Sequence, residues 1–174
     1  MADKPPGPLC GTGPSIALKS LLVPTDFSEA SECALRYGRA LAHAFGASLH
    51  VVHVIEDLVA TAWAAEVYVT SLPVLREEIE KDAQERLARL LDADERERLH
   101  ARVVLLNGNP FVEILRYARA HEIDLIVLGT HGRGPVAHML LGSVAEKVVR
   151  KATCPVLAVR HPQHEFVRPS AGDS

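Results

Sequence analysis

The stretch IVLGTHGRGPVAHMLLGS, residues 126–143, joins the end of an apolar strand to the beginning of a helix. The apolar run of residues 125–128 breaks at Gly129, a glycine-rich loop follows, and Gly142-Ser143 precedes a helical pattern. Glycine has no Cβ, so the backbone N–H groups of such a loop can approach an anion closely. A helix N-terminus also favours negative charge, because its first N–H groups lack helical partners and the helix dipole is positive there. The stretch therefore predicts a phosphate-binding loop.

A purely structural interpretation accounts for the same residues. Glycine and proline punctuate loops of every kind, and each glycine taken alone can be a turn residue. Ser143-Val144-Ala145-Glu146 also has the pattern of a capping box, in which the serine hydroxyl accepts a hydrogen bond from the helix backbone. The two interpretations are compatible, because a capped helix still presents its remaining N–H groups to a phosphate.

Apolar runs typical of buried parallel strands alternate with helical patterns along the chain. The expected strands are residues 17–23, 49–55, 101–106, 125–128 and 156–160. The first helix is expected to begin at Asp26 or Ser28 and to stop at Gly46. The other helices are expected over residues 74–91, from Asn109-Pro110 onward, and over residues 143–152. This order predicts an α/β fold, in which one five-stranded, doubly wound parallel sheet of the Rossmann-like kind is flanked by helices through right-handed crossovers.

Two connections carry weaker patterns. Residues 92–97 are expected to form a polar connection without a helix, and residues 56–73 match neither the strand nor the helix period. The length of 174 residues suits one domain, residues 17–160, between flexible tails at residues 1–16 and 161–174.

Composition excludes several classes of function. The net charge of −3, without a local Lys/Arg cluster, argues against a nucleic-acid partner. The longest apolar runs fall far short of the roughly 20 residues that a membrane span needs. The N-terminus lacks the apolar core of a secretion signal. Cys10, Cys33 and Cys154 form no C-x-x-C pair, which favours reduced thiols and a cytoplasmic location, with Cys33 as a core residue.

Known catalytic and metal-binding motifs are missing from the sequence. It contains no Gly-x4-Gly-Lys-Ser/Thr loop, no Gly-x-Ser-x-Gly elbow and no His-Glu-x-x-His pair. His50 and His53 are expected to face opposite sides of a strand, so they form no metal cage. No catalytic residue and no protein metal site is therefore predicted, and binding is favoured over turnover.

The spacing Gly129-x2-Gly132-x9-Gly142-Ser143 resembles the ATP-binding signature of the universal stress protein family. Three further blocks match in order: residues 23–28 (VPTDFS), residues 49–55, and residues 154–159 (CPVLAV). Together the resemblance covers about residues 18–160. It implies the strand order 3-2-1-4-5, binding of ATP with Mg²⁺ or Mn²⁺ at the phosphates, and a homodimer through the last strand, Val156–Val159.

The predicted binding residues come partly from the chemistry of the side chains and partly from the family resemblance. In that strand order the first and fourth strands are neighbours at a switch point, where doubly wound sheets bind ligands. From its chemistry, Asp26 is a partner for a ribose hydroxyl or a base amino group, or it is only a helix cap. Thr25 is a candidate for contact with a phosphate or a metal-bound water. The resemblance adds a contact of the Val54 backbone with adenine. The full predicted set is Pro24, Thr25, Asp26, Val54, Leu128, Gly129, Gly132, Arg133, Gly142, Ser143 and Val144.

Three hypotheses of function follow. The first is a cytoplasmic ATP-binding stress protein that acts as a nucleotide-dependent switch or sensor. The second is an interaction module of the same fold without a nucleotide. The third is a slow ATPase or phosphotransferase, whose phosphate release would disappear when Asp26 or His131 is changed. His131 and Arg133 of the loop are also candidates for adding positive charge at the γ-phosphate. The apolar character of Val156–Val159 independently favours a partner at the edge of the sheet, since exposed edges of this kind pair with other chains.

Overall fold

The computed structural model describes residues 16–56, 72–130 and 141–160. Its strands are β1 (Ser20–Pro24), β2 (Ser48–Ile55), β3 (Arg102–Asn107), β4 (Leu125–Gly129) and β5 (Val156–Val159). Its helices are α1 (Glu29–Phe45), α3 (Leu72–Leu90), α4 (Ala93–Arg98), α5 (Pro110–Ala120) and α6 (Ser143–Lys151). The expectations for the two tails, Cys10, the loop residues His131, Gly132 and Arg133, and most of residues 56–73 lie outside the described residues.

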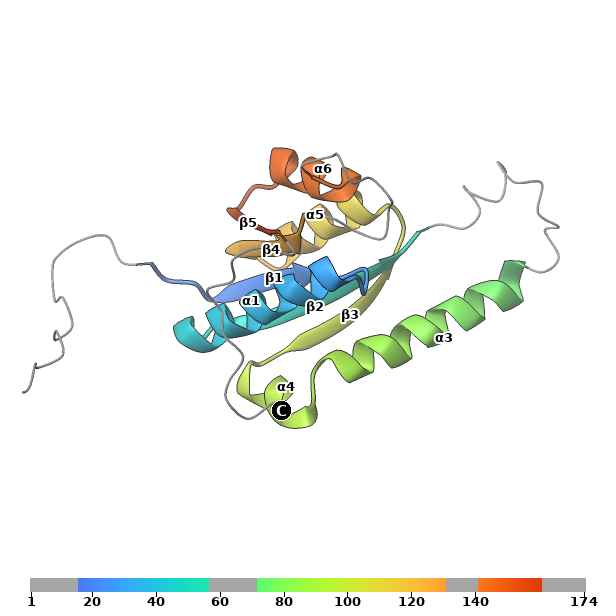
Figure 1. Cartoon of the computed structure of the whole chain (residues 1–174), viewed down its shortest axis with the longest axis horizontal. Helices are drawn as coiled ribbons and strands as arrows, with labels where there is room; N and C mark the ends of the chain where they lie inside the picture. Colours follow the sequence, from blue (N-terminus) through green and yellow to red (C-terminus); the bar gives the residue numbers. More distant parts are fainter. Residues whose placement is uncertain (1–15, 57–71, 131–140, 161–174) are drawn as a thin grey trace, which may run out of the picture.

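The strands form one parallel sheet in the order β3-β2-β1-β4-β5 (Figure 1). Leu21, Leu22 and Val23 of β1 are fully buried. Consecutive residues of a strand point to opposite faces, so three buried neighbours mean that β1 is covered on both faces. The predicted fold class and strand order are therefore confirmed. The strand ends coincide with the predicted ones or differ from them by at most three residues.

Helices cover the two faces of the sheet as separate layers. On one face, α1 and the end of α3 enclose a core that includes Cys33, Leu87 and Leu91. On the other face, α5 and α6 enclose a core that includes Ile114 and Val148 (Figure 1). The chain changes layer between β1 and β4, because β1 leads into α1 whereas β4 leads into α6. This arrangement puts the predicted switch point at the centre of the sheet.

Local sequence sets the ends of α1. The Ser28 hydroxyl accepts a hydrogen bond from the Ser31 N–H, so Ser28 is the N-cap. Gly46 ends the helix in the left-handed conformation at φ 63°, which a residue without Cβ adopts at little cost. The expected stop at Gly46 is confirmed, and the choice between Asp26 and Ser28 as cap is decided for Ser28.

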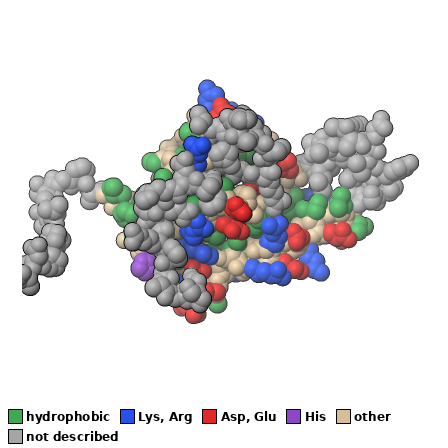
Figure 2. Space-filling model, in the orientation of Figure 1, with side chains coloured by type: hydrophobic (Ala, Val, Ile, Leu, Met, Phe, Trp, Pro, Cys, Tyr) green, Lys and Arg blue, Asp and Glu red, His purple; other side chains and the backbone are tan. Residues whose placement is uncertain are grey.

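The first half of α3 extends beyond the sheet. Figure 1 shows this end of the helix projecting from the body, and Figure 2 shows hydrophobic and acidic side chains gathered on it. Val74 is 60% exposed and Leu75 42% exposed, whereas Leu87 and Leu91 near the other end are buried. The helix expected over residues 74–91 therefore buries its apolar side chains near its end, while those at its start are exposed. None of the helices in the described ranges is both long and apolar enough to cross a bilayer.

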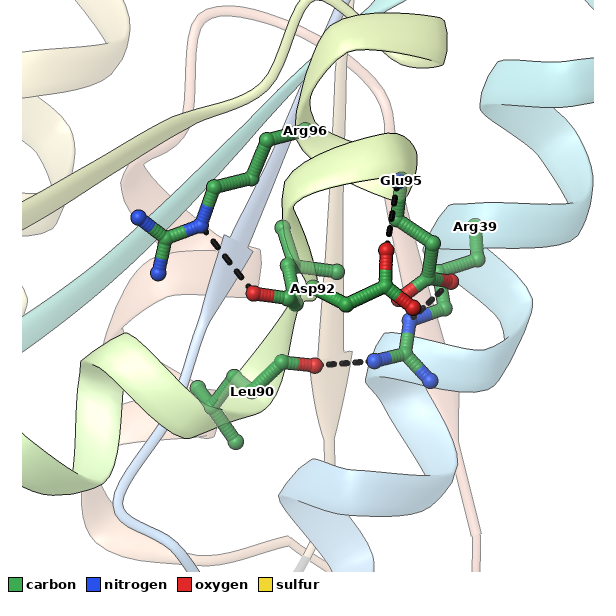
Figure 3. Close-up of polar contacts among 6 residues, drawn as sticks. Arg39, Leu90, Asp92, Glu95 and Arg96 are labelled. Atoms are coloured by element: carbon green, nitrogen blue, oxygen red, sulfur yellow. Dashed lines mark hydrogen bonds and ion pairs between the residues drawn. The ribbon is translucent and has the colours of Figure 1, made fainter.

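The expectation of a polar connection at residues 92–97 is also wrong, because this segment contains α4. Asp92 is the N-cap of this helix, accepting a hydrogen bond of 2.7 Å from the Glu95 N–H (Figure 3). Arg39 of α1 donates to the Leu90 carbonyl, and its Nε lies 3.3 Å from Glu95 Oε1. Arg96 Nε donates to the Leu91 carbonyl at 3.1 Å. Polar contacts with α1 and α3 thus fix a helix that has no apolar stripe of its own.

Candidate functional site

The turn after β1 is held by its own polar groups. Thr25 is buried, and its N–H donates to the Val52 carbonyl of β2 at 2.8 Å. The Thr25 hydroxyl accepts from the Phe27 N–H at 3.0 Å and lies 3.1 Å from the Ser31 hydroxyl. These bonds tie the turn both to β2 and to the first turn of α1. The Thr25 side chain is therefore part of the frame of the site.

Asp26 is half-buried in the same turn. Its Oδ1 accepts hydrogen bonds from the Ser28 N–H at 3.1 Å and from the Ser28 hydroxyl at 2.6 Å. Burial alone raises the pKa of this carboxyl, but the hydrogen bonds from Ser28 and Ser31 outweigh it and leave the pKa below its usual value. Asp26 is therefore a carboxylate at neutral pH. Such a group accepts hydrogen bonds from hydroxyl or amino groups and is a poor general base.

Phe27 takes a backbone conformation that few side chains favour. Its φ is 61°, in the left-handed region. The Phe27 ring lies 4.5 Å from the His53 ring, centroid to centroid, and the Arg86 guanidinium of α3 lies 4.2 Å from its centroid. His53 Nδ1 lies 2.7 Å from the Thr25 carbonyl and donates to it. These contacts support the turn from the α1 side of the sheet, and neither the sequence pattern nor the motif indicates them.

Gly129 ends β4 beside the turn. A Cβ at this position would lie 2.7 Å from the carbonyl carbon and oxygen of Ala30, which are backbone atoms of α1. Real Cβ atoms do not approach backbone this closely, so β4 and α1 can pack here only around a glycine. The sequence interpretation assigned this glycine to close approach of a phosphate. The structure gives it a reason that needs no ligand.

Thr130 follows β4, and Gly142, which precedes α6, lies next to it. The Thr130 N–H donates to the Val159 carbonyl at 2.9 Å, and the Thr130 carbonyl accepts from the Gly142 N–H. Residues 130 and 142 are therefore adjacent, and both ends of the glycine-rich stretch lie at the carboxyl edge of β4 and β5. Thr130, which is buried, is a framing residue that the motif does not include.

The start of α6 corrects the predicted capping box. Gly142 is the N-cap, with extended backbone at φ −64° and ψ 156°, and Ser143 is the first residue of the helix. The Glu146 side chain pairs with Arg150 at 3.1 Å instead of reaching back to the cap. The Gly142 carbonyl accepts the first helical hydrogen bond, at 2.9 Å from the Glu146 N–H, so the cap is Gly142 and not Ser143. Ser143 is exposed, and the first N–H groups of α6 have no helical partner.

Most of the predicted site residues come together at this edge. Pro24 ends β1, Leu128 and Gly129 end β4, and Gly142–Val144 begin α6, while Val54 lies near the end of β2. Because β1 pairs with both β2 and β4, the carboxyl ends of these three strands are neighbours. Leu128, Val54 and Val144 belong to the layer of α5 and α6, and Asp26 leads into α1. The candidate site thus lies where the two layers diverge.

The two histidines of β2 face opposite layers, as predicted. His50 is buried, with its Nδ1 2.9 Å from the Tyr117 hydroxyl of α5, whereas His53 contacts the turn on the α1 side. Burial lowers the pKa of His50 to about 4, helped by the charges of Arg102 and His121. In the described part of the chain, no three His, Cys, Asp or Glu side chains are placed to hold a metal ion together.

Comparison with known proteins gives one family. The sequence model of the universal stress protein family matches residues 17–160. Universal stress protein MJ0531 of Methanocaldococcus jannaschii is 33% identical over 147 residues, which cover 84% of this chain and 85% of that protein. The structure of UspA from Lactobacillus plantarum superposes with a TM-score of 0.69 at 27% identity, over 84% of this chain and 100% of the other.

Two solved structures with this fold were determined with adenine nucleotides. One is a universal stress protein in complex with cAMP, with a TM-score of 0.53 at 24% identity. It covers 83% of this chain and 99% of that one. The other is a universal stress protein of Archaeoglobus fulgidus in complex with dAMP, with a TM-score of 0.54 at 21% identity. At these identities the likeness to the present chain is one of fold.

Proposed function

This chain belongs to the universal stress protein family, and from that premise we propose that it binds ATP at the carboxyl edge of β1 and β4. The observation that carries the proposal is the meeting of two separate motifs. The Asp26 turn and the start of α6 are 116 residues apart in sequence, from Asp26 to Gly142, yet both lie at the switch point of the sheet. One offers a carboxylate and the other offers free backbone N–H groups, which are the groups that a ribose and a phosphate require.

The proposed contacts follow from this division of chemistry. Asp26 accepts hydrogen bonds from ribose hydroxyls, and the N–H groups of Ser143 and Val144 face the phosphates at the positive end of α6. The backbone of Val54 contacts adenine, beside Leu128. Pro24 and Thr25 shape the opposite wall. Gly132, Arg133 and Gly142 complete the phosphate side, where Gly-rich backbone suits close approach.

A divalent cation accompanies the phosphates in this proposal. Mg²⁺ or Mn²⁺ would be held mainly by phosphate oxygens and water, since such ions need few protein ligands when a nucleotide supplies them. The ionised state of Asp26 at neutral pH suits an acceptor better than a proton-abstracting base. Hydrolysis of the bound ATP is therefore expected to be slow at most. The proposed role of the protein is a cytoplasmic, nucleotide-dependent switch or sensor of stress.

A thermal melt with Mg·ATP, and with Mg·GTP for comparison, tests this function. ATP at 100 times its dissociation constant adds about 2.7 kcal/mol to the stability, which raises the Tm by about 5–10 °C for a domain of this size. Asp26→Asn keeps an acceptor for Ser28 but removes the charge, so it should reduce the ATP-induced shift. It should also lower the apo Tm slightly, because the lowered pKa means that the charged form of Asp26 stabilises the folded protein.

The matched control for that variant is Asp94→Asn, an exposed carboxylate in the first turn of α4. Its ATP-induced shift should equal that of the unaltered protein. If neither ATP nor GTP moves the Tm of protein shown to be free of nucleotide, ATP binding is rejected.

One observation favours a second function, an interaction module that holds no nucleotide. Gly129 and Thr25, which both belong to the matching motifs, have structural reasons for their identity that need no ligand. A protein of this kind would show no Tm shift with ATP and would keep its cellular effect when Asp26 is changed to Asn.

We also propose that the protein forms a homodimer through β5. This strand is an edge of the sheet, and its Ala158 is exposed while Val156 and Leu157 are partly exposed. An apolar edge of this kind pairs with a second copy or is covered. Ala158→Glu should convert a dimer to a monomer in sedimentation, and an unchanged sedimentation coefficient would exclude this interface.

A further inference from the structure

A shallow groove runs along the outer surface of α5, on a helix face that the proposed nucleotide site does not use. It is lined by Phe111, Val112, Leu115, Arg116, Arg119 and Ala120. Val112 is 44% exposed. Lys147 and Lys151 of α6 lie over the Phe111 ring, with their Nζ atoms 5.0 and 5.4 Å from its centroid. The groove is therefore an apolar strip with cations along its edges.

The positive charge of this groove is not neutralised by its own helices. The acidic residues of α5 and α6 are Glu113 and Glu146, and they pair with Arg116 and Arg150. Among the residues that the structure describes, no carboxylate pairs with Arg119, Lys147 or Lys151. Apolar surface beside unpaired cations is suited to an amphipathic partner that carries carboxylates.

The same chain carries a surface of that chemistry on the projecting half of α3. Val74 and Leu75 are exposed there, and after Arg76 come the exposed carboxylates of Glu77 and Glu78. Arg76 pairs with Glu80 at 2.9 Å, so within the described ranges no cation is paired with Glu77 or Glu78. Figure 2 shows the hydrophobic and acidic side chains side by side on this end of the helix.

These two surfaces cannot meet within one chain. The helix α3 belongs to the layer of α1, whereas α5 and α6 cover the opposite face of the sheet (Figure 1). We propose that the first half of α3 in one copy docks in the groove on α5 of a second copy, beside the lysines of α6. Apolar side chains enter the groove, and Glu77 and Glu78 face Lys147, Lys151 and Arg119.

This contact is a helix-in-groove interaction, which relies on a few apolar anchors along one helix face. Half a helix buries less than the roughly 1,200–2,000 Å² of a standard interface, so the contact alone gives weak, concentration-dependent association. Its ion pairs are screened by salt. It does not involve β5, so it is independent of the edge pairing proposed above.

Disulfide cross-linking between two different variants tests the contact directly. In a Cys10→Ser background, Val74→Cys protein is mixed with Val112→Cys protein under mild oxidation. The matched control is Val149→Cys, since Val149 is also 44% exposed but lies about 200° around α6 from Lys147. The docked geometry raises the effective thiol concentration, so the first pair should give about tenfold more mixed disulfide than the control pair. Equal yields would overturn the proposal.

Charge reversal separates this occupant from any other. Glu77→Lys/Glu78→Lys on the Val74→Cys protein, or Lys147→Glu/Lys151→Glu on the Val112→Cys protein, should each lower the yield by about tenfold, the effect of about 1.4 kcal/mol. Both reversals together should restore it, which a folding defect could not do. If only Lys147→Glu/Lys151→Glu lowers the disulfide yield, or if the two reversals together fail to restore it, another acidic segment occupies the groove and the proposal is wrong.

Discussion

At Gly129 a single methyl group decides whether α1 can pack against β4. Gly129→Ala would put a Cβ 2.7 Å from two backbone atoms of Ala30, and backbone cannot rotate away as a side chain can. We expect this variant to lose about 1–3 kcal/mol of stability without any ligand present, by the cost of overpacking. The apo Tm should fall by about 2–4 °C for each kcal/mol lost.

Gly46→Ala is the matched control for this variant. Gly46 has a left-handed φ of 63° but no atom within 4 Å of a new Cβ, so its cost is conformational only, about 1 kcal/mol. An unchanged apo Tm for Gly129→Ala, combined with lost ATP binding, would mean that this glycine serves the ligand and that the packing explanation is wrong.

His50 makes stability depend on pH at the residue scale. Burial, with the charges of Arg102 and His121, lowers its pKa to about 4 in the folded protein, below the usual value of 6.5. Between these values the unfolded chain binds a proton that the folded protein refuses, so stability falls as the pH drops from about 6.5 to about 4 and levels off below. The loss is at most about 3 kcal/mol.

Urea unfolding at several pH values measures this dependence. His50→Asn should remove the slope between pH 6.5 and 4, whereas the same change at the exposed His100 should leave it in place. Equal slopes for all three proteins would show that other groups cause the acid sensitivity.

At the scale of elements, Arg39 joins three helices. The Nε of Arg39 is buried and forms an ion pair with Glu95 of α4, and the Nη2 of the same guanidinium donates to the carbonyl of Leu90, the last residue of α3 (Figure 3). Arg39→Ala should lower the urea midpoint by an amount worth about 1–3 kcal/mol, because it leaves the Leu90 carbonyl and the Glu95 carboxylate without their partner. The m-value should not change.

Arg150→Ala provides the comparison for a surface ion pair. Arg150 and Glu146 are 74% and 49% exposed, and such i,i+4 pairs contribute about 0.3–0.5 kcal/mol. Arg39→Ala and Arg150→Ala with equal midpoints would contradict the role assigned to the joint between α3 and α4.

The elements that the sequence predicts well are those bounded by strong local signals. The buried run at residues 21–23 ends at Pro24, and α1 lies between a serine cap and Gly46, so both could be placed before any coordinates. The helix α4 could not, because ADERER contains one apolar residue and shows no helical period. Its stability comes from Asp92 and from contacts with distant residues, which a local pattern does not contain.

In the candidate site, too, the sequence predicts one part and distant contacts determine the rest. Its location at the switch point follows from the order of the motifs, but the roles of individual residues depend on three-dimensional contacts. Ser143 fits a capping box in sequence, yet the first helical hydrogen bond runs from the Glu146 N–H to the Gly142 carbonyl, so the cap lies one residue earlier. The left-handed φ of Phe27 and its packing against His53 and Arg86 have no signature in the sequence.

At the scale of the whole molecule, the sheet turns two weak local features into one site. The turn at Asp26 belongs to the layer of α1, and the N-terminus of α6 belongs to the opposite layer. Parallel pairing of β1 with β4 is what makes their carboxyl ends neighbours. The topology therefore brings together the polar groups of the proposed nucleotide site, and changes in the core layers should affect stability more than ligand specificity.

Chemical-shift mapping of isotope-labelled protein on titration with Mg·ATP measures where the nucleotide lies. The proposed site predicts large backbone amide changes at Asp26, Val54 and Gly142–Val144. It also predicts small ones at the opposite edge, around Glu122 and on the surface of α4. Changes confined to the α5 groove or to α3, or no changes at millimolar Mg·ATP, would contradict a nucleotide site between β1 and β4.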